Sequence, residues 1–200
     1  MAGNLKAFGG FDSSGIHKLD HYAAFLKTFG SDILGYSGFL WIARVVLLVS
    51  VVLHIITVIQ LAILNKQARP VGYQQEKKSF SEFSASMMKW GGLLLAVFII
   101  FHILHLTIGI VHSDFKEGEV FHNITVAFSN PFMVAFYAIV MFFLALHLYH
   151  GVWSVFQTLG VNQPKYNVYF RSTAKAVSMV VSLGFILVPF AILLGFLGQK

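Results

Sequence analysis

The sequence predicts an all-α membrane protein, a transmembrane helix bundle with four spans. Of its 200 residues, 57% are hydrophobic and only 11% are charged, whereas soluble chains carry roughly 25% charged residues. The apolar residues gather in four stretches, each near or above the roughly 20 residues that cross a bilayer core. Apolar and polar residues show no sustained alternation, so the pattern does not favour strands.

The chain is predicted to form one membrane domain, 1–200. Pro189 is expected to kink the last span, and residues 1–38 lack the apolar core of a signal peptide. The expected spans lie at about 39–64, 88–112, 131–159 and 176–197.

Charge in the loops predicts the orientation of the chain. Eight of the 14 Lys and Arg residues lie in or beside the segments 65–87 and 160–175: Lys66, Arg69, Lys77, Lys78, Lys89, Lys165, Arg171 and Lys175. The positive-inside rule places these two loops in the cytoplasm. Residues 1–38, the 113–130 loop and the C-terminus then face outward. The net charge of +6 is explained by these loops, and no nucleic-acid partner is expected.

The chain contains nine His and no Cys. Disulfides, thiolate metal sites, iron–sulfur ligation and cysteine nucleophiles are therefore excluded. An ionisable side chain inside the membrane is costly and is a functional hypothesis by default; the alternative for any single one is a hydrogen bond to a neighbouring helix. Five histidines lie within the expected spans: His54, His102, His105, His147 and His150.

Their depths predict two layers. His54 lies ten residues, about 15 Å, before the cytoplasmic end of its span, and His147 lies twelve residues, about 18 Å, before the end of its own. The two imidazoles are thus expected at nearly one level in the inner half of the membrane. His102 lies fourteen residues, about 21 Å, from the inner edge and belongs to a different layer.

Two neutral imidazoles at one depth match the axial ligands of a haem. A bare transition-metal ion normally needs more ligands, often carboxylate or thiolate, and neither is nearby. Haem needs two axial ligands and an apolar pocket, which a helix bundle provides. Small residues leave room for a macrocycle or for close helix packing: Gly91, Gly92, Gly109 and Gly151.

The spacing i, i+3 places His102 with His105, and His147 with His150, on one helical face each. Only one member of each doublet can comfortably ligate a given iron. The other member can bond a haem propionate, a quinone oxygen or a backbone carbonyl, and spacing alone does not choose between them.

Five segments of the chain resemble one family in the right order: VVLHIITVIQLAI, NKQARPVGY, FHILHLTIGIVH, FSNPFMVAFY and LHLYHGVWSVFQTLGVNQPKY. Together they resemble the cytochrome b membrane anchor of succinate dehydrogenase. The most similar form is the type B anchor, a single chain with two haems, shared by succinate:quinone and quinol:fumarate reductases. The resemblance covers nearly the whole chain.

The resemblance implies five helices that hold two stacked b haems. His54 and His147 would ligate the haem nearer the cytoplasmic iron–sulfur subunit. His102 matches one ligand of the outer haem, while His105 and His150 would lie beside the ligands as further cofactor contacts.

The family's first helix, which carries the other outer ligand, has no counterpart in this chain. Met1 falls about one residue beyond that ligand, so a truncated start is expected. The outer haem is left with one strong ligand of the family type, unless His17 or His21 substitutes.

The implied activity is electron transfer between an iron–sulfur subunit and membrane quinone in a bacterial cytoplasmic membrane, as part of the tricarboxylic acid cycle and respiratory chain. Flavin and clusters would belong to a separate flavoprotein and iron–sulfur subunit, and no catalytic residue is assigned. The resemblance places the quinone site toward the outer side, where the polar candidates are Asp12, Asp20, Asp32, His105 and His112.

Three basic residues have further expected roles. Arg44 can reach a haem propionate or extend to the membrane surface. The loops around Arg69 and Lys165 form either the docking surface for the iron–sulfur subunit or contacts with lipid headgroups.

Two alternatives stay open. One is a b-type cytochrome subunit of another quinone-linked respiratory enzyme. The other is a transporter or proton channel whose histidines relay protons; it predicts internal repeats with broken helices, and none is evident beyond Pro189.

Overall fold

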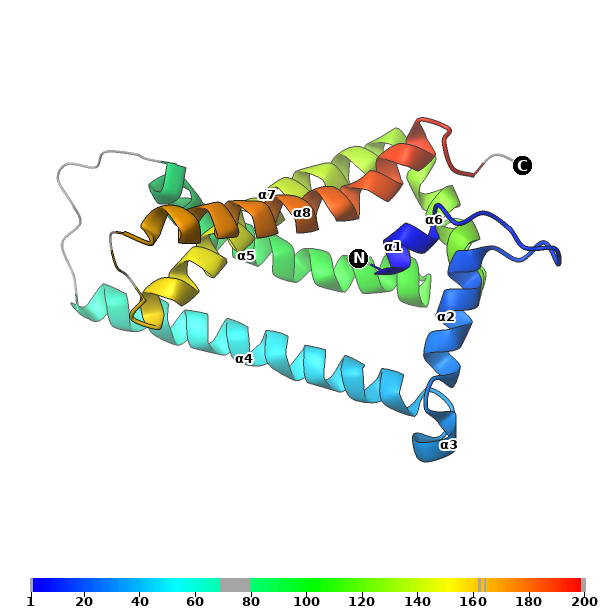
Figure 1. The fold of residues 1–200 in the computed structure, drawn as a ribbon, viewed down its shortest axis with the longest axis horizontal. Helices are drawn as coiled ribbons and strands as arrows, with labels where there is room; N and C mark the ends of the chain where they lie inside the picture. The colour runs from blue at the N-terminus through cyan, green and yellow to red at the C-terminus, as the bar shows by residue number, and fades with distance from the viewer. Residues whose placement is uncertain (1, 69–79, 162, 164, 199–200) are drawn as a thin grey trace. The chain divides into compact units, whose positions relative to one another are not determined.

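A computed structural model describes residues 2–68, 80–161, 163 and 165–198 (Figure 1). Within these ranges the chain forms α-helices and one π-helical turn, with no strand. Its long helices are α4 (Gly38–Ala68), α5 (Phe80–Ile103), α7 (Pro131–Thr158) and α8 (Asn167–Leu193). Four segments are long and apolar enough to cross a membrane. The all-α class with four spans is thereby confirmed, and the chain is a multi-pass membrane protein.

The helices extend past the expected spans on the loop side. α5 begins at Phe80 rather than near residue 88, and α8 begins at Asn167 inside the expected loop 160–175. An apolar run marks the part of a helix in lipid, while backbone hydrogen bonds continue into polar residues beyond it. The hydropathy pattern therefore located the membrane segments but not the helix starts.

The second span ends earlier than expected. A π-helical turn, η1 (Leu104–Ile108), follows α5 directly, and the helix stops at Gly109 instead of continuing to His112. Gly109 has φ +85° and its N–H donates to the Leu104 carbonyl. A left-handed glycine of this kind ends a helix, because other residues rarely adopt that conformation.

Four short helices lie in residues 1–38 and 113–130, which the charge pattern predicts to face outward and which are named the outer segments for that reason. They are α1 (Ala2–Lys6), α2 (Lys18–Thr28), α3 (Ser31–Leu34) and α6 (Val120–Phe128).

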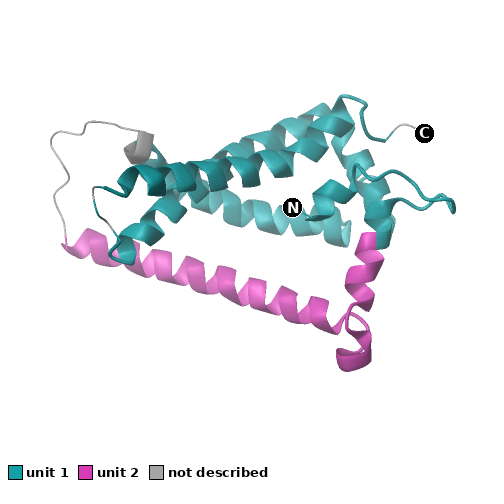
Figure 2. Ribbon diagram, in the orientation of Figure 1, with its two compact units in different colours: residues 1–21, 78–200 teal, residues 22–77 magenta. Residues whose placement is uncertain are grey.

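The chain divides into two compact units, residues 1–21 with 78–200 and residues 22–77 (Figure 2). In the first unit α5, α7 and α8 pack side by side (Figure 1). Buried side chains such as Phe98, Val134, Val140 and Val188 form its core. In the second unit no residue of α4 is buried.

Two of the singled-out glycines serve close helix packing. A Cβ on Gly91 would lie 3.2 Å from Cδ1 of Phe143, and a Cβ on Gly92 would lie 3.6 Å from Cε1 of His147. Both side chains belong to α7, so the two glycines let α5 and α7 approach each other. A Cβ on Gly151 would meet no described atom within 4 Å.

Candidate functional site

The side chain of Tyr137, on α7, joins the two histidines of the first doublet. Its hydroxyl lies 3.1 Å from Nδ1 of His105 and 3.3 Å from Nδ1 of His102. Tyr137 and His105 are buried, with 5% and 3% of their surfaces exposed. The two imidazoles therefore share one face of their helix, as the i, i+3 spacing predicts.

The proton count of this cluster restricts its tautomers. A tyrosine hydroxyl donates one hydrogen bond, so it can donate to only one of the two Nδ1 atoms. The other imidazole must then donate its own Nδ1–H to the hydroxyl oxygen. A neutral imidazole protonated at Nδ1 has a bare Nε2, which is the atom that a metal ligand presents. At least one of His102 and His105 is thus prepared to ligate.

His105 lies inside the π-helical turn η1. Single π-turns within α-helices are rare and frequently occur at functional sites. The wider turn changes the angular position of the residues that follow it, and it ends the helix next to the cluster. The ring of His112 follows, with its centroid 5.3 Å from that of His105.

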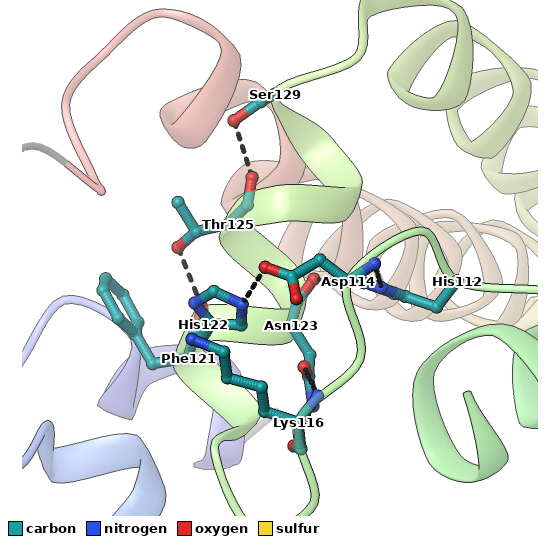
Figure 3. Close-up of polar contacts among 8 residues, drawn as sticks. All are labelled: His112, Asp114, Lys116, Phe121, His122, Asn123, Thr125 and Ser129. Carbon is teal, nitrogen blue, oxygen red and sulfur yellow. Dashed lines mark hydrogen bonds and ion pairs between the residues drawn. The ribbon is translucent and has the colours of Figure 1, made fainter.

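Both ring nitrogens of His112 are used within the outer loop. Nε2–H donates to the Asn123 carbonyl at 2.9 Å, and Nδ1 accepts from the Asp114 N–H at 3.1 Å. Figure 3 shows His112 and Asp114 in this loop. An imidazole with both nitrogens engaged offers no lone pair to a metal and no proton to a quinone, so His112 holds the loop.

The side chain of Asn123 closes the same loop (Figure 3). It accepts from the Lys116 N–H at 2.8 Å and donates to the Lys116 carbonyl at 2.8 Å. Close by, Nε2 of His122 lies 2.9 Å from a carboxylate oxygen of Asp114. The side chains of Asp114, His122 and Asn123 thus make their polar contacts within this loop and α6.

The N-terminal segment packs onto α6. Asp20 accepts a hydrogen bond from the Phe121 N–H at 2.8 Å and so satisfies one of the free N–H groups at the start of that helix. The imidazole of His17 stacks on the Phe121 ring with centroids 3.6 Å apart, and its Nδ1 accepts from the Leu19 N–H. Burial lowers the pKa of His17, so the docked imidazole is held neutral.

Asp12 also has a local role. Its carboxylate accepts from the Ser14 and Ile16 N–H groups, and from Nε2–H of His21 at 2.6 Å. The hydrogen bond from His21 lowers the pKa of the Asp12 carboxyl. The quinone candidates Asp12 and Asp20 thus stabilise the outer segment, while Asp32 lies on α3 in the second unit.

The other span histidines are His147, His150 and His54. His147 is half-buried on α7, with its ring against Gly92 of α5, and His150 is half-buried one turn later. Ten residues separate Gly92 from His102 along α5, which corresponds to about 15 Å. His147 and His102 therefore lie in different layers, as their depths predicted. His54 is exposed on α4 in the second unit, so its pairing with His147 stays a prediction.

Two of the basic residues that the sequence singled out lie near aromatic rings. The guanidinium of Arg44 is 5.0 Å from the Trp41 ring centroid, near the start of α4, and Lys165 Nζ is 5.7 Å from that of Tyr166. Arg44 thus packs on an aromatic side chain beside the end of its helix, the position at which it can reach the membrane surface. Arg69 lies outside the described residues.

The sequence pattern did not identify Tyr137, because only the histidines within the spans stood out as candidate ligands. The available signal was a hydroxyl near the outer end of an otherwise apolar run. Among the described residues no three His, Asp or Glu side chains gather as a metal-ion site. Comparisons with protein-family models, curated proteins and solved structures gave no match.

Proposed function

We propose that the chain is the haem b-containing membrane anchor of a succinate:quinone oxidoreductase or quinol:fumarate reductase. The observation that carries the proposal is the arrangement of span histidines in two layers about 15 Å apart along α5. One layer contains His147, and the other contains His102 and His105 on Tyr137. The order of sequence motifs supports the same family.

The donor set fits haem better than a bare ion. The candidate ligands at these depths are imidazoles, since no Cys, Asp or Glu lies within the four expected spans. Haem requires two axial ligands while its porphyrin supplies the rest. His54 and His147 would hold the inner haem. His102 would offer Nε2 to an outer haem, with Tyr137 fixing its ring through Nδ1.

When bound, haem supplies one-electron transfer at a potential that ligands and burial adjust. The chain's own residues would orient the imidazoles, exclude water with their apolar side chains, and anchor the complex. His105, His150 and Arg44 are the further cofactor-contact candidates. Flavin and iron–sulfur clusters would be carried by two partner subunits, docked on the cytoplasmic loops around Arg69 and Lys165.

The quinone site would lie toward the outer layer, in the cytoplasmic membrane of a bacterium. Because both nitrogens of His112 are engaged in the loop, His105 is the better candidate there. Its buried imidazole and the Tyr137 hydroxyl together can exchange a proton with a quinone oxygen.

An absorption spectrum of the purified protein tests the proposal. Sharp α bands of reduced b haem are expected, and a colourless preparation would refute it. Co-purification of a flavoprotein and an iron–sulfur protein would separate this enzyme from another quinone-linked cytochrome b complex.

One observation favours a second candidate, a proton-conducting protein. The Tyr137 hydroxyl connects His102 and His105 into a polar chain that reaches the ring of His112. Tyr137 and His105 are the buried members of this chain. Proton flux through vesicles containing a colourless protein, lost in Tyr137→Phe, would support that function instead.

A further inference from the structure

A cavity of about 580 Å³ lies between α7 and α8. Its apolar lining includes Phe142, Leu146 and Met179, and its polar lining includes Tyr149, Arg171 and Lys175. None of the described residues that line it is acidic, while Arg171 and Lys175 each carry a positive charge. The volume falls in the range of pockets that hold small ligands.

The cavity is separate from the histidine layers. Its α7 lining residues Leu146 and Tyr149 face α8, whereas Phe143 and His147 face the glycines of α5. The two sets occupy different faces of one helix, as expected for residues one position apart. A ligand in the cavity would therefore not compete with a cofactor on His147.

The two cations lie at the depth of lipid headgroups. Lys175 directly precedes the start of the expected fourth span at residue 176, and Arg171 lies one turn before it. The Arg171 guanidinium is 4.7 Å from the ring centroid of Trp153 on α7, which holds it across the two helices. The apolar lining lies deeper in the predicted membrane.

We propose that this cavity binds one anionic phospholipid on the cytoplasmic side of the membrane. The phosphate group would lie between Arg171 and Lys175, since guanidinium and ammonium groups are the usual donors to phosphate. An acyl chain would pack on Phe142, Leu146 and Met179. Basic pockets between transmembrane helices are known to hold anionic headgroups, and the apolar lining favours a lipid over free phosphate.

Native mass spectrometry of the detergent-purified full chain tests the proposal. With phosphatidylglycerol, one lipid should be retained per chain at a concentration several-fold lower than with phosphatidylcholine. The double variant Arg171→Gln/Lys175→Gln should lose this preference. The control Lys89→Gln, an exposed cation outside the cavity lining, should keep it.

A second variant guards against misfolding of the first. Met179→Trp keeps both cations and fills the apolar part, so it should also reduce phosphatidylglycerol retention. Equal retention of the two lipids, or an unchanged preference in the double variant, would overturn the proposal. Displacement of phosphatidylglycerol by inorganic phosphate would assign the site to a free anion and also overturn it. The readout does not depend on haem content, so the two proposals fail independently.

Discussion

His17 of the N-terminal segment and His105 of the second span are both buried, with 2% and 3% of their surfaces exposed, but they are used differently. His17 and His112 each accept a backbone N–H at Nδ1, so their lone pairs serve loops. In the spans, the geometry around Tyr137 requires a bare Nε2 on His102 or His105. The comparison teaches that burial alone does not mark a ligand. The hydrogen bond made by Nδ1 determines whether Nε2 keeps a lone pair that a metal could use.

The largest effect is expected when span histidines, and not outer histidines, are removed. His54→Ala and His147→Ala should each abolish the inner b-haem signal, because one remaining axial ligand does not replace the pair. Reduced-minus-oxidised difference spectra measure this. His122→Ala, a histidine of α6 paired with Asp114 and given no ligand role, is the control and should leave the spectrum unchanged. Retention of the signal in both span variants would refute the pairing.

Removing the Tyr137 hydroxyl tests the outer layer. Tyr137→Phe keeps the ring contacts with Phe98 and Phe128 but loses the contact to both Nδ1 atoms. Loss of a group that orients a ligand typically weakens binding by about 10–100-fold. Haem titration of the apoprotein should show this loss in the outer haem only. Unchanged outer affinity would mean that Tyr137 does not orient the ligand.

Substitutions in the outer segments should change local stability and leave cofactor binding unchanged. Asp20→Ala removes the cap of α6 and should cost about 1 kcal/mol, whereas Asp20→Asn should retain most of it. Hydrogen exchange of residues 2–21 and 120–128 reports the difference. An equal increase in exchange in both variants would show that the cap is not the stabilising contact.

The smallest expected effect is a pH dependence of the packing of the N-terminal segment on α6, which is called docking. His17 is held neutral by burial, which lowers its pKa below the usual 6.5. The undocked imidazole binds protons more readily, so docking is fully favourable above about pH 6.5 and weakens as the pH falls below it. Hydrogen exchange of residues 2–21 should therefore accelerate relative to α7 at low pH. His17→Phe should remove that dependence.

The sequence predicted the class, the four spans and the separation of His147 from His102 along the bundle, because long apolar runs and the positions of residues within them are strong signals. The pairing of His54 with His147 stays a prediction. It did not predict the starts of α5 and α8, since polar residues continue a helix outside the membrane. Nor could it identify Tyr137 or the loop role of His112. Tyr137 contacts histidines 32 and 35 residues away, and the role of His112 depends on how the chain turns after η1 to bring the Asn123 carbonyl of α6 to its ring. Neither arrangement can be read from local sequence patterns.

The most direct test of the central claim is the electron paramagnetic resonance spectrum of the oxidised protein. Two imidazoles on one iron should give a low-spin ferric haem signal. The signal of the inner haem should be lost or become high-spin in His54→Ala and in His147→Ala. A protein without a ferric haem signal, or an inner signal that both variants preserve, would contradict the account.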